Sequence, residues 1–476
     1  MFKKMTKNIA LILLLLFLSA CGQPRAKYVF VFIGDGMGII HMNAAERYLA
    51  SMEDKGGIVP LAMNQAPVHG MITTYSANRY ITDSAAGITA LLSGKKTTNG
   101  TLNMDPEHRY PLKTVAETAK DRGMKVGVIT NVGIDHATPA GIYAHQPKRS
   151  NYIEIAKQLA YSNFDFFAGA DFQAEAAERD SIITLVKQNG IIYINNATAF
   201  QYLEPGAGKV LFIHPDSNHE KALPYSMDRD EHSITLSEML MKAILMLEGP
   251  EGFFILIEGG KIDWACHGND AAASIHETLA LDEAVKTALA FYEKYPQNTL
   301  ILITADHETG GMSMGTNYGD NRVDLSKLQW QKGSFTELIR EFEDIRDYLI
   351  EKNGIDSVMQ NPGWAFEFVV EQTGLGDPEK GLGMNEYEKQ HLVAAYEQSF
   401  TERNWSDPYE YMLYGSYNPF MMAVSRTLSR KAGIGWTTYS HTGAPVPVRA
   451  FGTGAEQFGN YYDNTGIAER LLKVLQ

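Results

Sequence analysis

Carboxylate and imidazole side chains stand directly after apolar segments of the sequence. The segment Tyr28–Ile33 leads into a Gly-Asp-Gly turn that exposes Asp35. The segment Thr299–Thr304 ends close to Asp306 and His307, which can supply an oxygen and a nitrogen ligand together. Both ligand types suit zinc. The sequence predicts a metal site here, although either turn alone is also compatible with a structural role.

A third apolar segment, Phe253–Ile257, runs into Glu258. Asp263 and His267 follow with a spacing of four residues, which would put both side chains on one face of a helix. This pair suits chelation of one ion, and the alternative is a capping aspartate beside an unrelated histidine. Three apolar segments in a row that each end near a carboxylate are hard to attribute to packing.

Ser84 stands at the expected start of a helix that runs through Leu92 and ends at Gly94. Backbone N–H groups at a helix N-terminus favour anions. The hydroxyl is therefore either a helix cap, which is the commoner outcome for an isolated serine, or a nucleophile. Since no histidine nearby in the sequence offers a base, a nucleophilic Ser84 would require activation by a metal.

The elements that must position these residues alternate between strands and helices. A capping box at Thr235 predicts a helix to about Glu248, and Ala271–Tyr292 predicts a second one. This alternation indicates an α/β fold with a large, mostly parallel sheet and helices on both faces. Such sheets bind ligands at the carboxyl ends of their strands. The strands are expected at five runs rich in Val, Ile and Phe: Tyr28–Ile33, Lys125–Thr130, Phe164–Ala168, Phe253–Ile257 and Thr299–Thr304.

The stretch 316–438 interrupts this alternation. It is rich in aromatic residues and predicts helices near Phe335–Lys352 and Asn385–Ser399. We interpret it as an insertion, either a lid or a crown-like dimer surface, within one catalytic domain that spans 21–476. The strand pattern returns at Pro445–Gly452, and Thr465–Leu475 is expected to form the closing helix.

The N-terminus is typical of an export signal. Lysines precede the apolar run Ile9–Leu18, which is too short for an ordinary membrane-spanning helix. The following Leu-Ser-Ala-Cys resembles a bacterial lipobox, so we expect a signal peptide over 1–20 and lipidation of Cys21. A plain signal peptide is the alternative. The lipid would make the chain a periplasmic or cell-surface lipoprotein anchored to a bacterial membrane.

The chain of 476 residues has a formal net charge of −14. An acidic protein is a poor candidate for nucleic-acid binding, which needs a basic surface. If the substrate is an anion, the positive charge that attracts it must be local, and bound metal ions can supply it.

Six segments occur in the order found in the alkaline phosphatase family, which this sequence resembles from Tyr28 to about Gly452. The resemblance is weakest after Gly315. The segments are Gly34-Asp35-Gly36, Thr82-Asp83-Ser84-Ala85-Ala86, His136-Ala137-Thr138-Pro139-Ala140, Glu258-Gly259-Gly260-Lys261-Ile262-Asp263, Thr304-Ala305-Asp306-His307 and His441-Thr442-Gly443.

The resemblance implies an enzyme (EC 3.1.3.1) that hydrolyses phosphate monoesters with two Zn²⁺ and one Mg²⁺. Ser84 would form a phosphoserine intermediate, and Arg149 would hold two phosphate oxygens with its planar fork. Members are often homodimers, so a homodimer is possible here. The implied ligands are Asp263, His267 and His441 for the first zinc, Asp35, Asp306 and His307 for the second, and Asp35, Thr138 and Glu258 for magnesium.

Two positions vary within the family. His136 stands where some members have aspartate, and Trp264 stands where others have lysine or histidine. We expect both residues to border the magnesium and phosphate sites. The predicted consequences are altered magnesium affinity, looser phosphate binding and faster product release. Simple packing of Trp264 at the rim is the alternative.

Other functions fit the sequence less well. A sulfatase is disfavoured, because Ser84 is followed by Ala85-Ala86-Gly87 rather than by nearby proline and arginine. A phosphodiesterase or phosphomutase of the same superfamily is closer, but Arg149 suits the extra charged oxygens of a monoester. A non-catalytic metal-binding surface lipoprotein would have no use for Ser84 and Arg149.

Overall fold

The computed structural model describes residues 25–476 except 219, 317–321, 402 and 404–406. The predicted signal peptide and Cys21 lie outside the described residues. Within the described part of the chain, no helix has the length and apolar character needed to cross a membrane.

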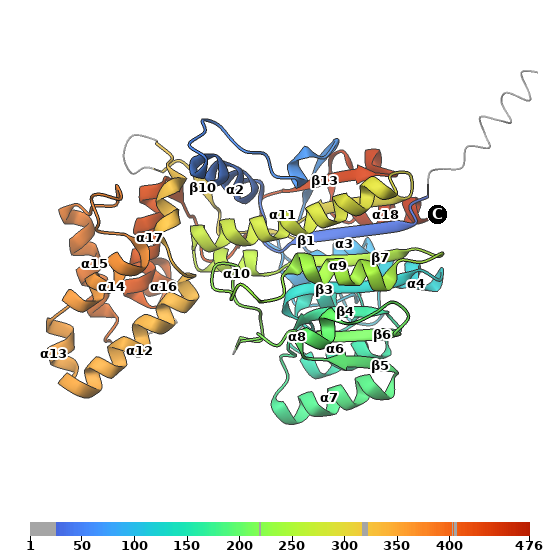
Figure 1. Ribbon diagram of the computed structural model, residues 1–476, viewed down its shortest axis with the longest axis horizontal. Coiled ribbons are helices and arrows are strands. Elements are labelled where there is room, and N and C mark those ends of the chain that lie inside the picture. The colour runs from blue at the N-terminus through green and yellow to red at the C-terminus, as the bar shows by residue number, and fades with distance from the viewer. Residues whose placement is uncertain (1–24, 219, 317–321, 402, 404–406) are drawn as a thin grey trace, which may run out of the picture.

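A ten-stranded sheet forms the centre of the molecule (Figure 1). Its strand order is β14-β2-β13-β8-β1-β7-β3-β4-β6-β5, and only β13 runs antiparallel to its neighbours. The mostly parallel sheet therefore agrees with the prediction. The strands are β1 Tyr28–Gly34, β2 Val68–Thr73, β3 Lys125–Gly133, β4 Phe166–Ala170, β5 Ile191–Ile194, β6 Lys209–Ile213, β7 Phe253–Gly259, β8 Thr299–Thr304, β13 Val446–Gly452 and β14 Asn460–Asp463.

The three central strands are apolar on both sides because helices cover both faces. Every residue of β1, β7 and β8 is buried. α9 and α11 pack against each other and contact β7, whereas α3, α4 and α18 form a second group. The helices around the sheet are α2 Ile39–Met52, α3 Ser84–Ser93, α4 Val115–Asp121, α5 Ala137–Ala140, α6 Tyr152–Tyr161, α7 Ala176–Gln188, α8 Ala197–Gln201, α9 Leu236–Leu247, α10 Lys261–His267, α11 Ala271–Lys294 and α18 Gly466–Leu475.

The stretch read as an insertion is helical and lies at one end of the molecule, coloured orange in Figure 1. Its interior is aromatic: the rings of Phe342 and Trp364 stack with centroids 5.0 Å apart, and Phe420 packs on Phe342. Its elements are η2 Leu325–Trp330, α12 Phe335–Asn353, α13 Ile355–Gln360, α14 Gly363–Thr373, α15 Glu386–Gln398, α16 Pro408–Tyr414 and α17 Pro419–Ala432.

Two short ladders join the chain where it leaves the sheet and where it returns. β9 (Glu308–Thr309) pairs with β12 (His441–Thr442), and β10 (Ser313–Met314) pairs with β11 (Ile434–Gly435). Both ladders are antiparallel, so the two ends of the helical stretch lie side by side. This pairing brings residues after 433 back to the ends of the central strands.

The structure differs from the predicted strands at the edges of the sheet. β4 begins at Phe166 instead of Phe164, whose buried side chain packs in the core without joining the strand. β2, β5, β6 and β14 were not predicted. These strands are short or half-exposed, so their residues lack the long apolar runs of the central strands.

Candidate active site

The central strands bring three carboxylates to one edge of the sheet. β1 lies between β7 and β8, and Ile33 pairs with both Glu258 and Thr304. The ends of the three strands are therefore level, which explains why Asp35, Glu258 and Asp306 meet although they are far apart in the sequence. All three carboxylates are fully buried.

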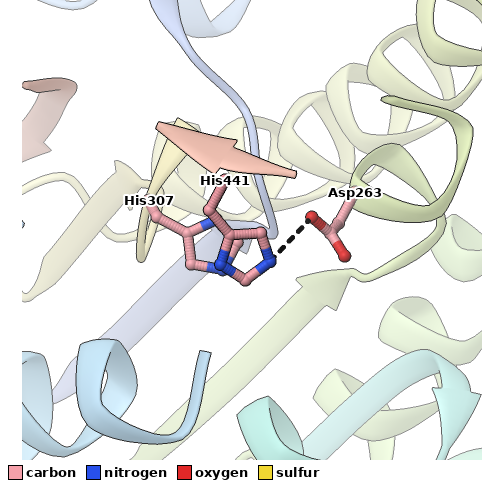
Figure 2. A group of neighbouring side chains, drawn as sticks. All are labelled: Asp263, His307 and His441. Atoms are coloured by element: carbon pink, nitrogen blue, oxygen red, sulfur yellow. Dashed lines mark ion pairs between the residues drawn. The ribbon is translucent and has the colours of Figure 1, made fainter. Parts of the chain in front are cut away.

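The β9–β12 ladder adds a histidine that follows the helical stretch in the sequence. His441 pairs with Thr309, two residues after His307. The imidazole rings of His307 and His441 stack with centroids 3.6 Å apart, and His441 Nε2 lies 3.7 Å from Asp263 Oδ1. Figure 2 shows His307 and His441 beside each other and facing Asp263 from α10.

The Nδ1 atoms of His267, His307 and His441 each have a polar partner outside the site. His267 Nδ1 donates to the carbonyl of Tyr439 at 2.5 Å, and His441 Nδ1 donates to the carbonyl of Thr82 at 2.9 Å. A carbonyl only accepts, so these nitrogens carry the hydrogen. His307 Nδ1 lies 3.2 Å from the Thr309 hydroxyl. In each ring Nε2 is left for the site, which is how metal-binding histidines are commonly oriented.

The chemistry of the buried oxygens tests whether these residues fit metal ions. Asp35 Oδ1, Asp306 Oδ2 and Glu258 Oε1 have no hydrogen-bond partner among the described residues. Buried charges without partners are costly, so this cluster fits cations. Three groups have ligand atoms within 4.8 Å of one another: Asp263, His307 and His441; Asp35, Asp306 and His307; and Asp35, His136 and Glu258.

The electrostatics of the protein without metal point the same way. Burial and repulsion from neighbouring carboxylates raise the pKa of Asp35 well above its usual range. Burial raises the pKa of Glu258 to about 8 and that of Asp306 to about 7. Burial also acts against ionisation of Asp263, but the charges of His267 and His441 hold its pKa well below the usual range.

Ser84 is the first residue of α3 and does not cap it. The cap is Asp83, whose Oδ1 accepts from the backbone N–H of Ala86 at 3.1 Å. The Ser84 hydroxyl is therefore free to face the carboxylates, and its Oγ lies 3.3 Å from His307 Nε2. The interpretation of Ser84 as a helix cap is wrong, because the preceding aspartate already fills that position.

Arg149 lies beside the start of α3. Its guanidinium donates to Asp83 Oδ2 and to His136 Nε2, both at 3.2 Å. Since arginine only donates, His136 must accept with Nε2 and is neutral. Burial and the nearby charge of Arg149 lower the pKa of His136 to about 3. Two contacts thus hold the planar fork of Arg149 in one orientation close to Ser84.

Comparison with known proteins places this site in a family. The family model for alkaline phosphatase matches residues 26–166 and 168–476. The chain belongs to the alkaline phosphatase family. Alkaline phosphatases are metal-dependent phosphomonoesterases, so the predicted enzyme class, a phosphoric monoester hydrolase, is confirmed.

Individual relatives match nearly the whole chain. Alkaline phosphatase 3 of Bacillus subtilis (strain 168) is 30% identical, and the match covers 95% of this chain and 90% of that protein. Alkaline phosphatase 4 of the same organism is 29% identical over 96% and 91%. A cold-active alkaline phosphatase from Shewanella sp. has 28% identity and a TM-score of 0.76, with 94% and 100% covered. The predicted fold class is confirmed.

The structure brings the predicted ligands together with two differences in grouping. His267 Nε2 lies 3.3 Å from Asp263 Oδ2, but His307 joins Asp263 and His441 in the tighter group. Thr138 donates its hydroxyl to Asp35 Oδ2 at 3.0 Å. A nitrogen of His136 lies with the carboxylates of Asp35 and Glu258. The sequence predicted only that His136 borders the magnesium and phosphate sites.

Two threonines that the sequence did not point to hold carboxylates of the candidate site. Thr309 donates its hydroxyl to Asp263 Oδ1, and Thr130 donates to Glu258 Oε2. Thr309 lies two residues after His307, and Thr130 ends a predicted strand. Their positions near strand ends were therefore the only signal in the sequence that could have found them. Threonine is common in strands, which is why neither stood out.

Trp264 packs beside His136. Its ring meets His136 edge to face, with centroids 6.0 Å apart. Behind it, the fully buried Lys261 places its ammonium 4.8 Å from the Trp264 ring centroid and 3.7 Å from that of Tyr225. Trp264 therefore lies between the buried Lys261 ammonium and His136, which accepts from Arg149.

Proposed function

We propose that this enzyme hydrolyses phosphate monoesters to an alcohol and inorganic phosphate through a phosphoserine on Ser84. The observation that carries the proposal is the Ser84 hydroxyl at the start of α3, which does not cap the helix. His307 Nε2 lies 3.3 Å from it, and Arg149 lies beside the same helix start. A metal store has no need of this arrangement.

Two zinc ions and one magnesium ion are the proposed cofactors. The zinc sets are Asp263, His267 and His441, and Asp35, Asp306 and His307; the magnesium set is Asp35, Thr138 and Glu258. Nitrogen and carboxylate ligands suit zinc, and oxygen ligands suit magnesium. When bound, the ions supply Lewis acidity that lowers the pKa of the Ser84 hydroxyl and stabilises the departing ester oxygen.

The side chains of Ser84, Arg149 and His136 have separate roles in the reaction. Ser84 Oγ bonds to phosphorus while the ester oxygen leaves with a proton as the alcohol. Water then breaks the bond between phosphorus and Oγ, which releases phosphate and restores the serine. Arg149 faces the charged phosphoryl oxygens during both displacements, because Asp83 and His136 orient its fork. Burial and the charge of Arg149 lower the pKa of His136 to about 3, so at neutral and alkaline pH its ring is neutral and can accept from Arg149.

We expect Arg149→Ala to lower kcat/KM for an aryl phosphate monoester about 100-fold, since each hydrogen bond to a charged group contributes about 1.5 kcal/mol or more. A diester lacks one charged oxygen, so its hydrolysis should fall much less. Steady-state kinetics on both substrates measures this. The control is Arg340→Ala, whose side chain pairs with Glu337 on exposed α12. Equal losses on the two substrates would favour the phosphodiesterase alternative.

Trp264→Lys is expected to tighten inhibition by inorganic phosphate at least about fivefold, which corresponds to about 1 kcal/mol for a charge some 4 Å away in water. The buried Lys261 ammonium repels the new one and directs it toward the phosphate. Phosphate inhibition constants of the two proteins measure the effect, with Trp330→Lys on η2 as the matched control. Unchanged inhibition would leave Trp264 with a packing role.

Export and anchoring are also proposed. The lipobox-like segment before Cys21 supports a lipoprotein held at a bacterial membrane, periplasmic or at the cell surface. A homodimer remains part of the proposal, with the helices of 316–438 as the candidate lid or dimer surface.

A further inference from the structure

The pocket beside Ser84 is larger than a phosphate group requires. Its volume is about 660 Å³, within the range of sites that hold whole small molecules. Its lining includes Asp83, His267 and His441 of the candidate site. It also includes three residues of the loop before α3, namely Arg79, Tyr80 and Ile81. The pocket therefore has room beside the candidate site for the group that the phosphate esterifies.

The loop that carries these residues is tied down. Ser76 donates its backbone N–H to the carbonyl of Arg79 at 3.0 Å, and Asn99 donates to the carbonyl of Ile81 at 3.1 Å. The carbonyl of Thr82 accepts from His441 Nδ1 at 2.9 Å. One of these ties reaches a residue of the candidate metal site, so the loop keeps a set distance from Ser84. Such preorganisation lowers the cost of binding.

Tyr80 leaves a bare aromatic ring at the pocket. Its side chain is 77% exposed and that of Ile81 is 44% exposed. The ring lies directly over the backbone of Gly443, because a Cβ atom there would lie 2.4 Å from Tyr80 Cε1. Gly443 follows His441 by two residues. The absence of a side chain at Gly443 therefore lets the ring pack against the backbone at the edge of the candidate metal site.

The rim also carries a positive charge. Within the described part of the chain, no carboxylate lies within ion-pair distance of the Arg79 guanidinium. Arg79 and Tyr80 line the same pocket. A cation can favour a flat, polarizable group through cation–π contact, and an aromatic ring can favour it through stacking. An alkyl alcohol such as glycerol offers no ring to either residue.

We propose that Tyr80, with Ile81 and Arg79, forms a subsite for aromatic leaving groups. Aryl phosphates and nucleoside monophosphates, whose rings can stack on Tyr80, are then preferred over alkyl phosphates. The inference rests on the proposed function, since it requires the phosphoryl group to lie at Ser84. Stacked aromatic pairs contribute roughly a 2- to 10-fold preference.

The test compares two inhibitors that lack a scissile ester, phenylphosphonate and methylphosphonate, on the metal-loaded enzyme. Tyr80→Ala should raise the ratio of the phenylphosphonate to the methylphosphonate inhibition constant roughly 2- to 10-fold. Tyr80→Phe should keep the ratio, because the ring remains. Tyr202→Ala is the matched control, since Tyr202 is 80% exposed and lies at the end of α8.

Gly443→Ala gives a second, independent reading, because its methyl group displaces the Tyr80 ring without removing it. It should raise the same ratio in the native background and have no further effect on it in Tyr80→Ala. An unchanged ratio in both Tyr80→Ala and Gly443→Ala overturns the subsite. A native enzyme that binds both phosphonates, measured by calorimetry, but hydrolyses neither phenyl phosphate nor glycerol phosphate would refute the proposed function and leave the subsite measurable.

Discussion

Replacing Ser84 with alanine is expected to reduce the hydrolysis of an aryl phosphate by at least about 10³-fold, as removal of a catalytic nucleophile does in other hydrolases. The change removes the atom that bonds to phosphorus. It should not disturb the helix, because Asp83 supplies the cap of α3 and alanine has high helix propensity. The thermal midpoint should therefore stay close to that of the native enzyme, and kcat should carry most of the loss.

Ser93→Ala at the other end of α3 is the matched control, and full activity is expected. Among the described residues, the hydroxyl of Ser93 accepts only from the backbone N–H of Lys95. Mass spectrometry after acid quenching should find phosphate on Ser84 in the native enzyme and on no residue in Ser84→Ala. Hydrolysis at the native rate in Ser84→Ala would mean that another group, or water, attacks phosphorus.

Removing the metals is expected to abolish activity and to destabilise the protein most at alkaline pH. Without metal, burial raises the pKa of Glu258 to about 8 and that of Asp306 to about 7. Their unfolded values are near 4. The folded protein then holds protons that the unfolded chain releases, so the free energy of unfolding falls as pH rises from about 4 to about 8.

Bound ions reverse this dependence, because they stabilise the ionised carboxylates. At a free concentration 1,000 times the dissociation constant, each site adds about 4 kcal/mol. The thermal midpoint with and without chelator should therefore differ far more at pH 8 than at pH 5. Calorimetry at both pH values, with zinc and magnesium added back separately, measures this difference in thermal midpoint. Retained hydrolysis in chelator, or equal midpoints at pH 8, would contradict the metal site.

The central strands and the candidate ligands near their ends could be predicted from the sequence, because the signals are local. A run such as Phe253–Ile257 is buried on both faces, and its composition shows this without knowledge of its neighbours. Glu258 and Asp306 are then recognised by their position at strand ends. The edge strands could not be predicted in the same way, since their short or half-exposed segments resemble loops.

The roles within the site depended on contacts between distant segments. His307 reaches Ser84 only because β8 brings it to the same edge of the sheet as α3. The sequence offered no base near Ser84 and left a cap as the commoner reading, whereas the fold assigns the cap to Asp83. The burial of Lys261 behind Trp264 could not be predicted either, since lysine side chains are rarely fully buried.

The sequence by itself determined the class of fold, the family and the residue types that can hold metal and phosphate. These follow from local apolar runs and short motifs, whose physical signal lies within a few residues. Only the tertiary structure decided which ligands share a site, how Arg149 is held by Asp83 and His136, and that Tyr80 lies bare over Gly443. Those arrangements arise from strand register and from the β9–β12 ladder. Both bring together segments that are far apart in the chain, and nothing in the local sequence of one segment indicates the other.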